Sequence, residues 1–181
     1  MIKRHQTRTV RVGPVLIGGQ APVAIQSMNN TDTRDVAATL EQNRKLAEAG
    51  CYITRGALPD LEASADLARI RAASPLPLVA DIQFGYRPAH AAIEAGADKI
   101  RINPGNIGGP DRLRQVADAA RARHIPIRVG VNSGSLSKEI LARYGGVNAE
   151  AMVASALEAI GMLEACHFED LVLSIKASEP L

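Results

Sequence analysis

The feature that most limits the possible folds of this chain is a helix-to-strand unit that recurs four times. Residues 46–55 align with residues 92–101, and each segment contains a helix end, a glycine, a short apolar strand and a terminal arginine. Residues 121–128 also end in arginine, and residues 163–176 end in lysine. Helices and strands that alternate in this way are typical of parallel sheets with crossover helices. We therefore expect an α/β fold, specifically a TIM-type (β/α)8 barrel, with its functional groups at the carboxyl ends of the strands.

The chain length indicates how much of such a barrel is present. A (β/α)8 barrel usually takes about 250 residues, whereas this chain has 181. We expect one partial TIM barrel over residues 1–181, truncated to about six βα units, with two short strands over residues 9–17 as a plug beneath it. The strands over residues 23–28 and 171–176 should then each have an unpaired edge, which favours association with a second copy as a homodimer.

Composition excludes several classes of protein. The net charge of +2, without a basic run or an aromatic platform, argues against a nucleic-acid partner. No apolar run reaches the roughly 18 residues of a membrane span and the amino terminus has no signal-peptide core, so no membrane association and a cytoplasmic location are expected. Cys51 and Cys166 lie at helix-to-strand junctions and are expected to be small buried side chains. No metal-ligand spacing is present.

The stretch from Lys99 to Gly109 combines an apolar strand with charge on alternate residues. Side chains of a strand alternate between its two faces, so Lys99, Arg101 and Asn103 should share the face opposite Ile100. A parallel strand covered on both faces normally reads as a nearly continuous apolar run, and Arg101 breaks that pattern. The charge is understandable if this face lines the barrel interior near its carboxyl-end opening, where an anion can reach it.

Four cations at four strand ends predict an anion site. Arg55, Arg101, Arg128 and Lys176 would repel one another around one opening unless an anion were bound, and guanidinium groups suit bidentate phosphate contacts. A single strand-end arginine is more often a structural ion-pair partner, but four in register favour a ligand such as a diphosphate. Further polar residues are expected at the same opening, namely the acid Asp81, Gln26, and the neutral donors Asn103, Asn106, Asn132 and Ser133.

Five groups of motifs also carry a family resemblance. They are Pro22–Met28 with Thr31–Thr33, Val79–Ile82, Arg101–Ile107, Arg128–Leu136 and Ser174–Ser178. Together, in this order and over nearly the whole chain, they resemble the amino-terminal barrel of the 4-hydroxy-3-methylbut-2-enyl diphosphate synthase family. The resemblance implies an oxidoreductase of the non-mevalonate pathway of isoprene biosynthesis. Its reaction is the reductive ring opening of 2-C-methyl-D-erythritol 2,4-cyclodiphosphate, with flavodoxin or ferredoxin as the electron donor.

The resemblance also implies roles for individual residues. In the family the barrel binds the diphosphate, and a separate carboxyl-terminal domain holds a 4Fe-4S cluster through three cysteines and a glutamate. That domain is absent here, so we expect no catalytic residue and no metal ligand in this chain, which should be inactive alone. The implied substrate-binding residues are Arg55, Arg101, Asn103, Arg128, Asn132, Ser133 and Lys176, with Gln26, Asp81 and Asn106 as further candidates.

Two alternatives and three departures accompany this interpretation. A pterin-binding barrel of the dihydropteroate synthase type also uses strand-end aspartate, asparagine and lysine, but it does not call for arginines on three strands. The other alternative is a barrel fragment without catalysis. The departures are Gln83 and Gly85, where the family usually has histidine and aspartate, and Gly56, where it has a larger residue.

Overall fold

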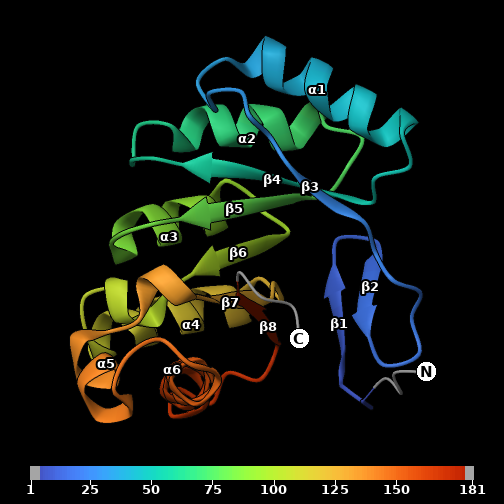
Figure 1. Cartoon of the computed structure of the whole chain (residues 1–181). Helices are drawn as coiled ribbons and strands as arrows, with labels where there is room; N and C mark the ends of the chain where they lie inside the picture. Colours follow the sequence, from blue (N-terminus) through green and yellow to red (C-terminus); the bar gives the residue numbers. More distant parts are fainter. Residues whose placement is uncertain (1–4, 178–181) are drawn as a thin grey trace.

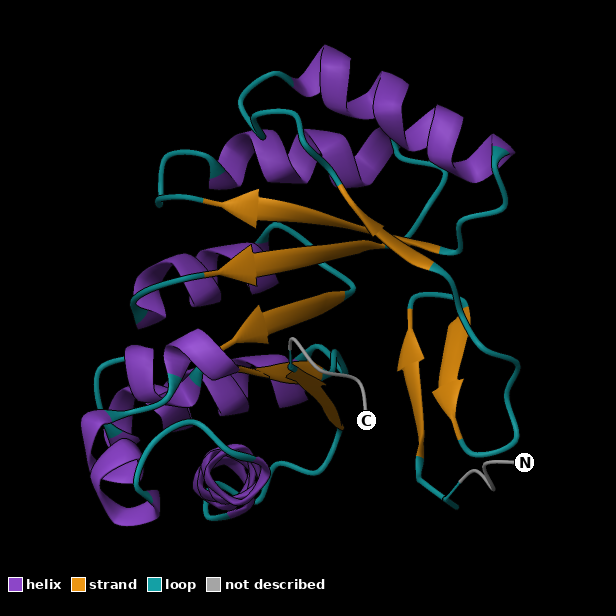
Figure 2. Cartoon of the chain, viewed as in Figure 1, coloured by secondary structure: helices purple, strands orange, loops and turns teal. Residues whose placement is uncertain are grey.

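The computed structural model describes residues 5–177, which form a curved parallel sheet with helices along one face and a hairpin at one end (Figure 1, Figure 2). The hairpin consists of β1 (Thr9–Val12) and β2 (Val15–Gly18). The sheet contains β3 (Gln26–Met28), β4 (Ile53–Leu58), β5 (Leu78–Ile82), β6 (Lys99–Ile102), β7 (Ile127–Asn132) and β8 (Leu171–Lys176). The helices are α1 (Val36–Glu48), α2 (Ser64–Ala73), α3 (Tyr86–Glu94), α4 (Pro110–Ala122), α5 (Lys138–Tyr144) and α6 (Ala149–Glu164).

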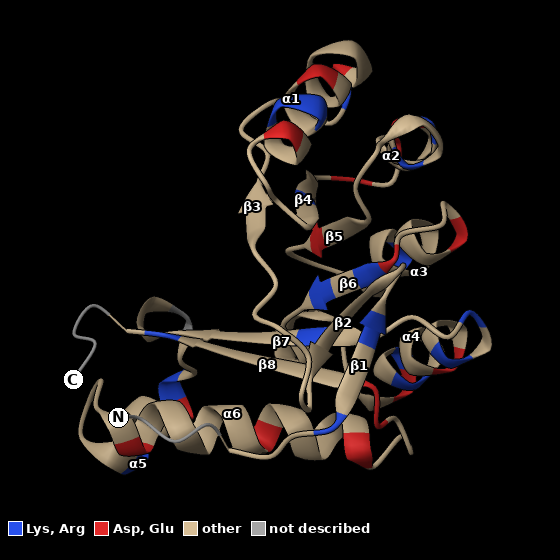
Figure 3. Cartoon of the chain, turned by 90° about the vertical axis from the view of Figure 1, so that its right-hand side faces the viewer, with Lys and Arg blue, Asp and Glu red and all other residues tan. Residues whose placement is uncertain are grey.

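The six strands lie side by side in chain order, from β3 to β8, and every neighbouring pair is parallel. Seen from the hairpin side, the strands form an arc, and α1, α2, α3, α4 and α6 lie around its outside (Figure 3). This is an open half-barrel, so the predicted partial (β/α) barrel is confirmed. Within the described residues β3 and β8 are the edge strands, as the sequence predicted.

Two differences from the sequence-based expectation have simple physical reasons. The first barrel strand is shorter than residues 23–28, because its partner β4 begins only at Ile53, which pairs with Gln26. Helix α5 was not expected at all. The sequence does contain the residues that start and stop this helix. Ser137 caps it by accepting a hydrogen bond from the Ile140 amide at 3.2 Å, and Gly145 ends it with a φ of 71°. Such a two-turn helix is too short to show a clear apolar period.

Alternation along the strands separates two environments. The outward side chains of the central strands, such as Ile100, Ile102 and Val129, belong to the main core and pack against the helices. On the inward face, Ile53 and Val79 form a second, smaller cluster with Val12 of the hairpin. We call the space bounded by this concave inner face the lumen. Its amino end is apolar and covered by the hairpin, which agrees with the expected plug.

A buried ion pair ties the amino end of the sheet together. Asp98 precedes β6, is 9% exposed, and accepts hydrogen bonds from the Leu78 amide at 2.8 Å and from Arg71 Nη2 at 2.9 Å. It also lies below the hairpin turn, where a Cβ on Gly13 would be 3.0 Å from Asp98 Oδ1. One carboxylate therefore links α2 and β5 directly beneath the hairpin turn.

Two further expectations concern cysteines and membranes. Cys51 and Cys166 are both free and buried, as predicted. Among the described residues no helix is long and apolar enough to cross a membrane.

Candidate functional site

Strand register brings the predicted arginines onto one face of the sheet. Met28 is level with Arg55, and Asp81 is level with Arg101, which is in turn level with Arg128 on the next strand. In a parallel sheet, residues at the same level point to the same side. Figure 3 shows the basic segments of β6 and β7 on adjacent strands of the arc. Residues separated by more than twenty positions in sequence therefore line one lumen.

Asp81 lies between two of these arginines. Its Oδ2 is 3.3 Å from Arg55 Nη2 and its Oδ1 is 3.2 Å from Arg101 Nη1, while the Asp81 side chain is only 8% exposed. The sequence interpretation assumed that the arginines would repel one another without a bound anion. The structure corrects this, because Asp81 offsets part of their charge and holds two guanidinium groups in place.

Among the described residues, Arg128 has no such carboxylate partner. Its Nη2 donates a hydrogen bond to Ser174 Oγ at 2.8 Å, but its Nε is buried without a hydrogen-bond partner, as is the Nε of Arg55. Burial lowers the pKa of Arg128, the charges of Arg55 and Arg101 lower it further, and Asp81 opposes the shift. Buried donors without partners are costly unless a ligand satisfies them.

Sequence reasoning did not include Lys99 among the site residues. It is 1% exposed and inward-facing, level with Val79, and its Nζ is 3.4 Å from Gln26 Oε1. Burial, together with the charges of Arg128 and Arg55, lowers the pKa of Lys99 to about 8. The sequence signal that could have identified Lys99 as a site residue is its position two residues before Arg101, because alternate residues of a strand share a face. We call Arg55, Asp81, Lys99, Arg101 and Arg128 the lumen cluster, which has four cations and one acid.

The remaining predicted residues lie at the carboxyl end of the lumen. Asn132 and Lys176 are level with each other on β7 and β8, and Lys176 is exposed. Ser133 follows directly in a short 3-10 turn and is half-buried. These three residues thus form part of the rim above Arg128.

Two predicted asparagines shape the loop after β6. Asn103 Oδ1 accepts a hydrogen bond from the Gly105 amide at 3.2 Å, and Asn106 Nδ2 donates one to the Gln83 carbonyl at 3.3 Å. Asn106 also accepts the Gly85 amide through its backbone carbonyl at 3.0 Å. Asn103 therefore shapes the β6–α4 loop itself, and Asn106 joins that loop to the β5–α3 loop.

The three departures from the family pattern fall in different places. Gln83 and Gly85 lie in the β5–α3 loop at the rim, where Gly85 has a φ of 79° and a ψ of 151°. Side chains rarely adopt that conformation, so the loop in this form requires glycine. Gly56 is level with Ala80 of the outer core, so it faces away from the lumen.

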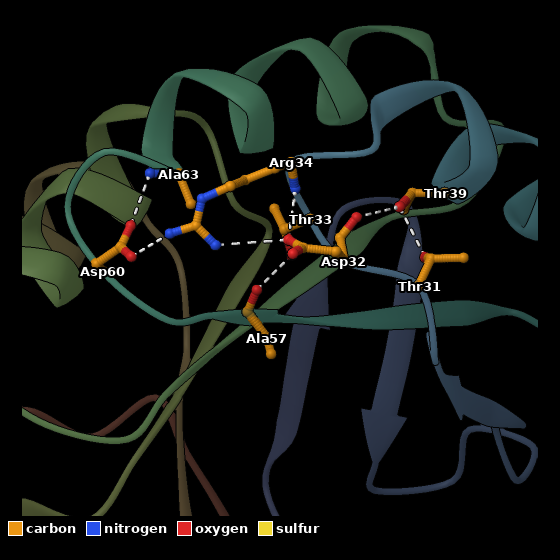
Figure 4. A network of polar contacts seen from close by, with 8 residues as sticks. All are labelled: Thr31, Asp32, Thr33, Arg34, Thr39, Ala57, Asp60 and Ala63. Carbon is orange, nitrogen blue, oxygen red and sulfur yellow. Dashed lines mark hydrogen bonds and ion pairs between the residues drawn. The ribbon is translucent and has the colours of Figure 1, made fainter.

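A polar network fixes the loop between β3 and α1 at the same end of the sheet (Figure 4). Thr33 Oγ1 donates a hydrogen bond to the Ala57 carbonyl at the end of β4, and Arg34 forms an ion pair with Asp60. Asp60 Oδ1 also accepts the Ala63 amide at 3.1 Å. The loop after β3 is thus held against the loop after β4.

Gly130 provides the space that Arg101 occupies. A Cβ at Gly130 would lie 2.8 Å from Arg101 Nε and 2.9 Å from its Nη2. The absence of a side chain at this position thus leaves room in the lumen for the Arg101 guanidinium.

Replacing Gly130 with alanine should displace the Arg101 guanidinium from Asp81 and weaken binding of a diphosphate ligand by about threefold to tenfold. Calorimetric titration measures the loss. Gly161→Ala is the control, since a Cβ there meets nothing within 4 Å and should leave affinity unchanged. Equal affinity in wild type and Gly130→Ala would show that Arg101 need not occupy its observed position.

The described residues do not form a metal or cluster site. No group of three or more His, Cys, Asp or Glu side chains among them could hold a metal ion. Iron-sulfur clusters are usually held by several cysteine ligands. Cys51 precedes β4 and Cys166 follows α6, and both are buried, so these residues do not fit a 4Fe-4S cluster.

Comparisons with known proteins agree with this geometry. Residues 7–181 match the family model of the GcpE TIM-barrel domain. The chain is 55% identical over 177 residues to the 4-hydroxy-3-methylbut-2-en-1-yl diphosphate synthase (flavodoxin) of Ruminiclostridium cellulolyticum, covering 98% of this chain and 50% of that protein. It is 54% identical over 181 residues to the protein of the same name from Maridesulfovibrio salexigens, covering 100% of this chain and 51% of that protein. The chain thus spans about half the length of these curated relatives.

Solved structures show the same fold at low sequence identity. An N-acetylneuraminic acid synthetase from Leptospira borgpetersenii aligns with a TM-score of 0.68 at 14% identity, over 98% of this chain and 62% of that chain. A 7,8-dihydropteroate synthase from Vibrio fischeri aligns with a TM-score of 0.65 at 16% identity, over 92% of this chain and 66% of that chain. At such identities the likeness concerns the barrel fold alone.

Proposed function

Since the chain belongs to the GcpE TIM-barrel family, we propose that it supplies the diphosphate-binding barrel of a 4-hydroxy-3-methylbut-2-en-1-yl diphosphate synthase. Its ligand would be 2-C-methyl-D-erythritol 2,4-cyclodiphosphate, and the whole protein would open the ring of this ligand reductively. The observation that carries the proposal is the lumen cluster, in which four inward-facing cations share one acid. Two linked phosphates would offset most of the remaining positive charge.

Each group in the lumen has a task in this proposal. Arg101 and Arg128 are level on adjacent strands and would bind phosphate oxygens as bidentate donors. Asp81 would keep Arg55 and Arg101 in position. Lys176, Asn132 and Ser133 at the rim would contact the part of the ligand nearest the opening.

The redox part of the reaction would depend on residues other than those described. The described residues do not fit a 4Fe-4S cluster, so we propose that its ligands belong to the part of the longer relatives that this chain does not match. The names of the relatives include flavodoxin, and we propose a flavodoxin as the electron donor of the whole protein. The homodimer stays a prediction.

The pterin alternative receives less support. The match to a dihydropteroate synthase structure has 16% identity, whereas the synthase relatives share 51–55% over nearly the whole chain. The pterin alternative also does not call for arginines on three strands, which this chain has on β4, β6 and β7.

Isothermal titration of the purified protein with the cyclic diphosphate, at pH 7 and low salt, tests the proposal. Charge-assisted contacts contribute about 1.5 to 3 kcal/mol each, so several of them predict micromolar or tighter binding that weakens with added salt. A parallel titration uses 7,8-dihydropterin pyrophosphate, the diphosphate ligand of the pterin alternative. Absence of heat with the cyclic diphosphate would contradict the proposed function, and tighter binding of the pterin compound would favour the alternative.

A further inference from the structure

The deeper part of the lumen contains a cavity that is not lined by the rim residues Asn132, Ser133 and Lys176. It has a volume of about 480 Å³ and is lined by polar groups from four strands, namely Gln26, Lys99, Arg128 and Ser174, and by apolar residues such as Ile17 and Ile53. It therefore lies between the rim and the apolar cluster beneath the hairpin.

The amine of Lys99 is unusually poorly paired for a buried cation. Within residues 5–177 its one hydrogen bond is the 3.4 Å contact with Gln26 Oε1, although an ammonium group has three donors. The side chain is 1% exposed, so burial removes most of the solvation of its charge. Buried charges are normally paired, and an unpaired one is costly.

The charged groups around Lys99 increase this cost. Arg55 on β4 and Arg128 on β7 both act on the amine as like charges. Arg101 lies two residues further along β6, and Asp81 on β5 is already paired with Arg55 and Arg101. The hairpin contributes apolar side chains, and Gln26 and Ser174 on the two edge strands are uncharged.

A purely structural role does not explain this residue. A methionine or leucine at position 99 would pack against the apolar cluster without any desolvation cost, and would relieve the repulsion with Arg55 and Arg128. The incompletely paired amine of Lys99 and the unpartnered Nε of Arg128 instead belong to two residues that line the same cavity of the lumen. Together they provide what a phosphate group needs.

We propose that Lys99 is a phosphate ligand at the floor of the lumen, and that at alkaline pH its amine takes up a proton when the anion binds. This rests on the proposed function for the identity of the ligand. The two phosphates would then lie at two levels of the lumen. One would lie near the rim, beside Arg101 and Arg128, and the other would lie above Lys99.

The direction of the pH dependence follows from the charges. In the free protein the pKa of Lys99 is lowered to about 8, whereas an adjacent phosphate would raise it toward the ordinary value of 10.5. At pH 7 the amine is already charged and binding takes up almost no proton. At pH 9 the free amine is mostly neutral, so binding takes up close to one proton, and affinity should fall by up to about tenfold per pH unit above pH 8.

Titration calorimetry in two buffers of different ionisation enthalpy measures both the affinity and the number of protons taken up on binding. The cyclic diphosphate is a suitable probe, because its phosphates are diester-like and do not titrate between pH 7 and 10. Inorganic pyrophosphate serves as a second probe for anions in general. Lys99→Met should weaken binding of either probe at pH 7 by at least about tenfold and abolish the difference in proton uptake between pH 7 and 9 for the cyclic diphosphate.

The matched control is Lys45→Met, whose side chain is 72% exposed on α1 and should change neither quantity. Lys99→Met should also melt at a temperature equal to or above that of the wild type, because it removes a buried unpaired charge. If Lys99→Met does not fold, Lys99→Gln and the wild-type proton uptake at pH 9 decide the matter.

The outcomes separate the two proposals. Normal binding of the cyclic diphosphate by Lys99→Met, with unchanged proton uptake, would overturn the role of Lys99 and leave the proposed function standing. Binding of pyrophosphate alone, lost in Lys99→Met, would support the anion site and overturn the identity of the substrate. If the wild type binds neither probe, both proposals are overturned.

Discussion

Arg101→Met should weaken binding of the cyclic diphosphate by about tenfold to a hundredfold, the largest effect on affinity that we expect from a single substitution. Arg101 occupies the middle of the lumen cluster, since it pairs with Asp81 at 3.2 Å and is level with Arg128 on the neighbouring strand. Methionine keeps most of the apolar stem of the side chain. The loss would therefore come from the guanidinium group.

Calorimetric titration at pH 7 measures this loss of affinity. A control variant, a conservative variant and the remaining partner of Asp81 help to attribute the loss to the Arg101 guanidinium. Arg69→Met is the control, because Arg69 is 70% exposed on α2 and, in the part of the chain that the structure describes, pairs only with Asp66 one turn away. Arg101→Lys keeps the charge but loses the bidentate geometry, so it should fall between wild type and Arg101→Met. Asp81 keeps Arg55 as a partner in both variants. Unchanged affinity in Arg101→Met would refute a central role for this strand.

Asp98→Ala should lower the free energy of unfolding by about 2 to 3 kcal/mol, which is the largest stability effect we expect outside the lumen. The substitution leaves the buried Leu78 amide without its acceptor and removes the carboxylate partner of Arg71. Because the Arg71 side chain is 35% exposed, water can solvate part of its freed charge, which keeps the loss below that of a fully buried pair.

Urea denaturation followed by circular dichroism at pH 7 measures the change in unfolding free energy. The control is Asp118→Ala, since Asp118 is 56% exposed and pairs with Arg121 on the same helix, so its loss should stay within about 0.5 kcal/mol. Equal stability losses in the two variants would show that Asp98 does not link α2 and β5 in the way described.

Much of the architecture could be predicted because it depends on local patterns. The recurring helix, glycine and strand gave the order of the sheet, and Asp35 caps α1 by accepting the Ala38 amide at 3.0 Å, at the position where polar residues precede the helix. Helix α5 was missed because two turns carry too little periodicity. The length of β3 was overestimated because a strand is defined by its partner, and β4 begins only at Ile53.

The candidate site was predictable in part for the same reason. Alternation along a strand assigns Arg101 to one face, and the carboxyl ends of parallel strands lie at one end of a sheet, so the convergence of Arg55, Arg101 and Arg128 could be expected. Lys99 follows the same alternation but was passed over, because its position at the start of β6 does not reveal whether the side chain reaches solvent or a closed lumen.

The sequence by itself therefore determined the fold class, the strand order and the kind of charge in the lumen, since each depends on the period and order of residues along the chain. Only the tertiary structure decided which charges are paired. Asp81 lies between Arg55 and Arg101 because three strands place it there, and Lys99 is left with a single long contact to Gln26. Electrostatic energies depend on distance and burial in three dimensions, and neither quantity is encoded in local spacing.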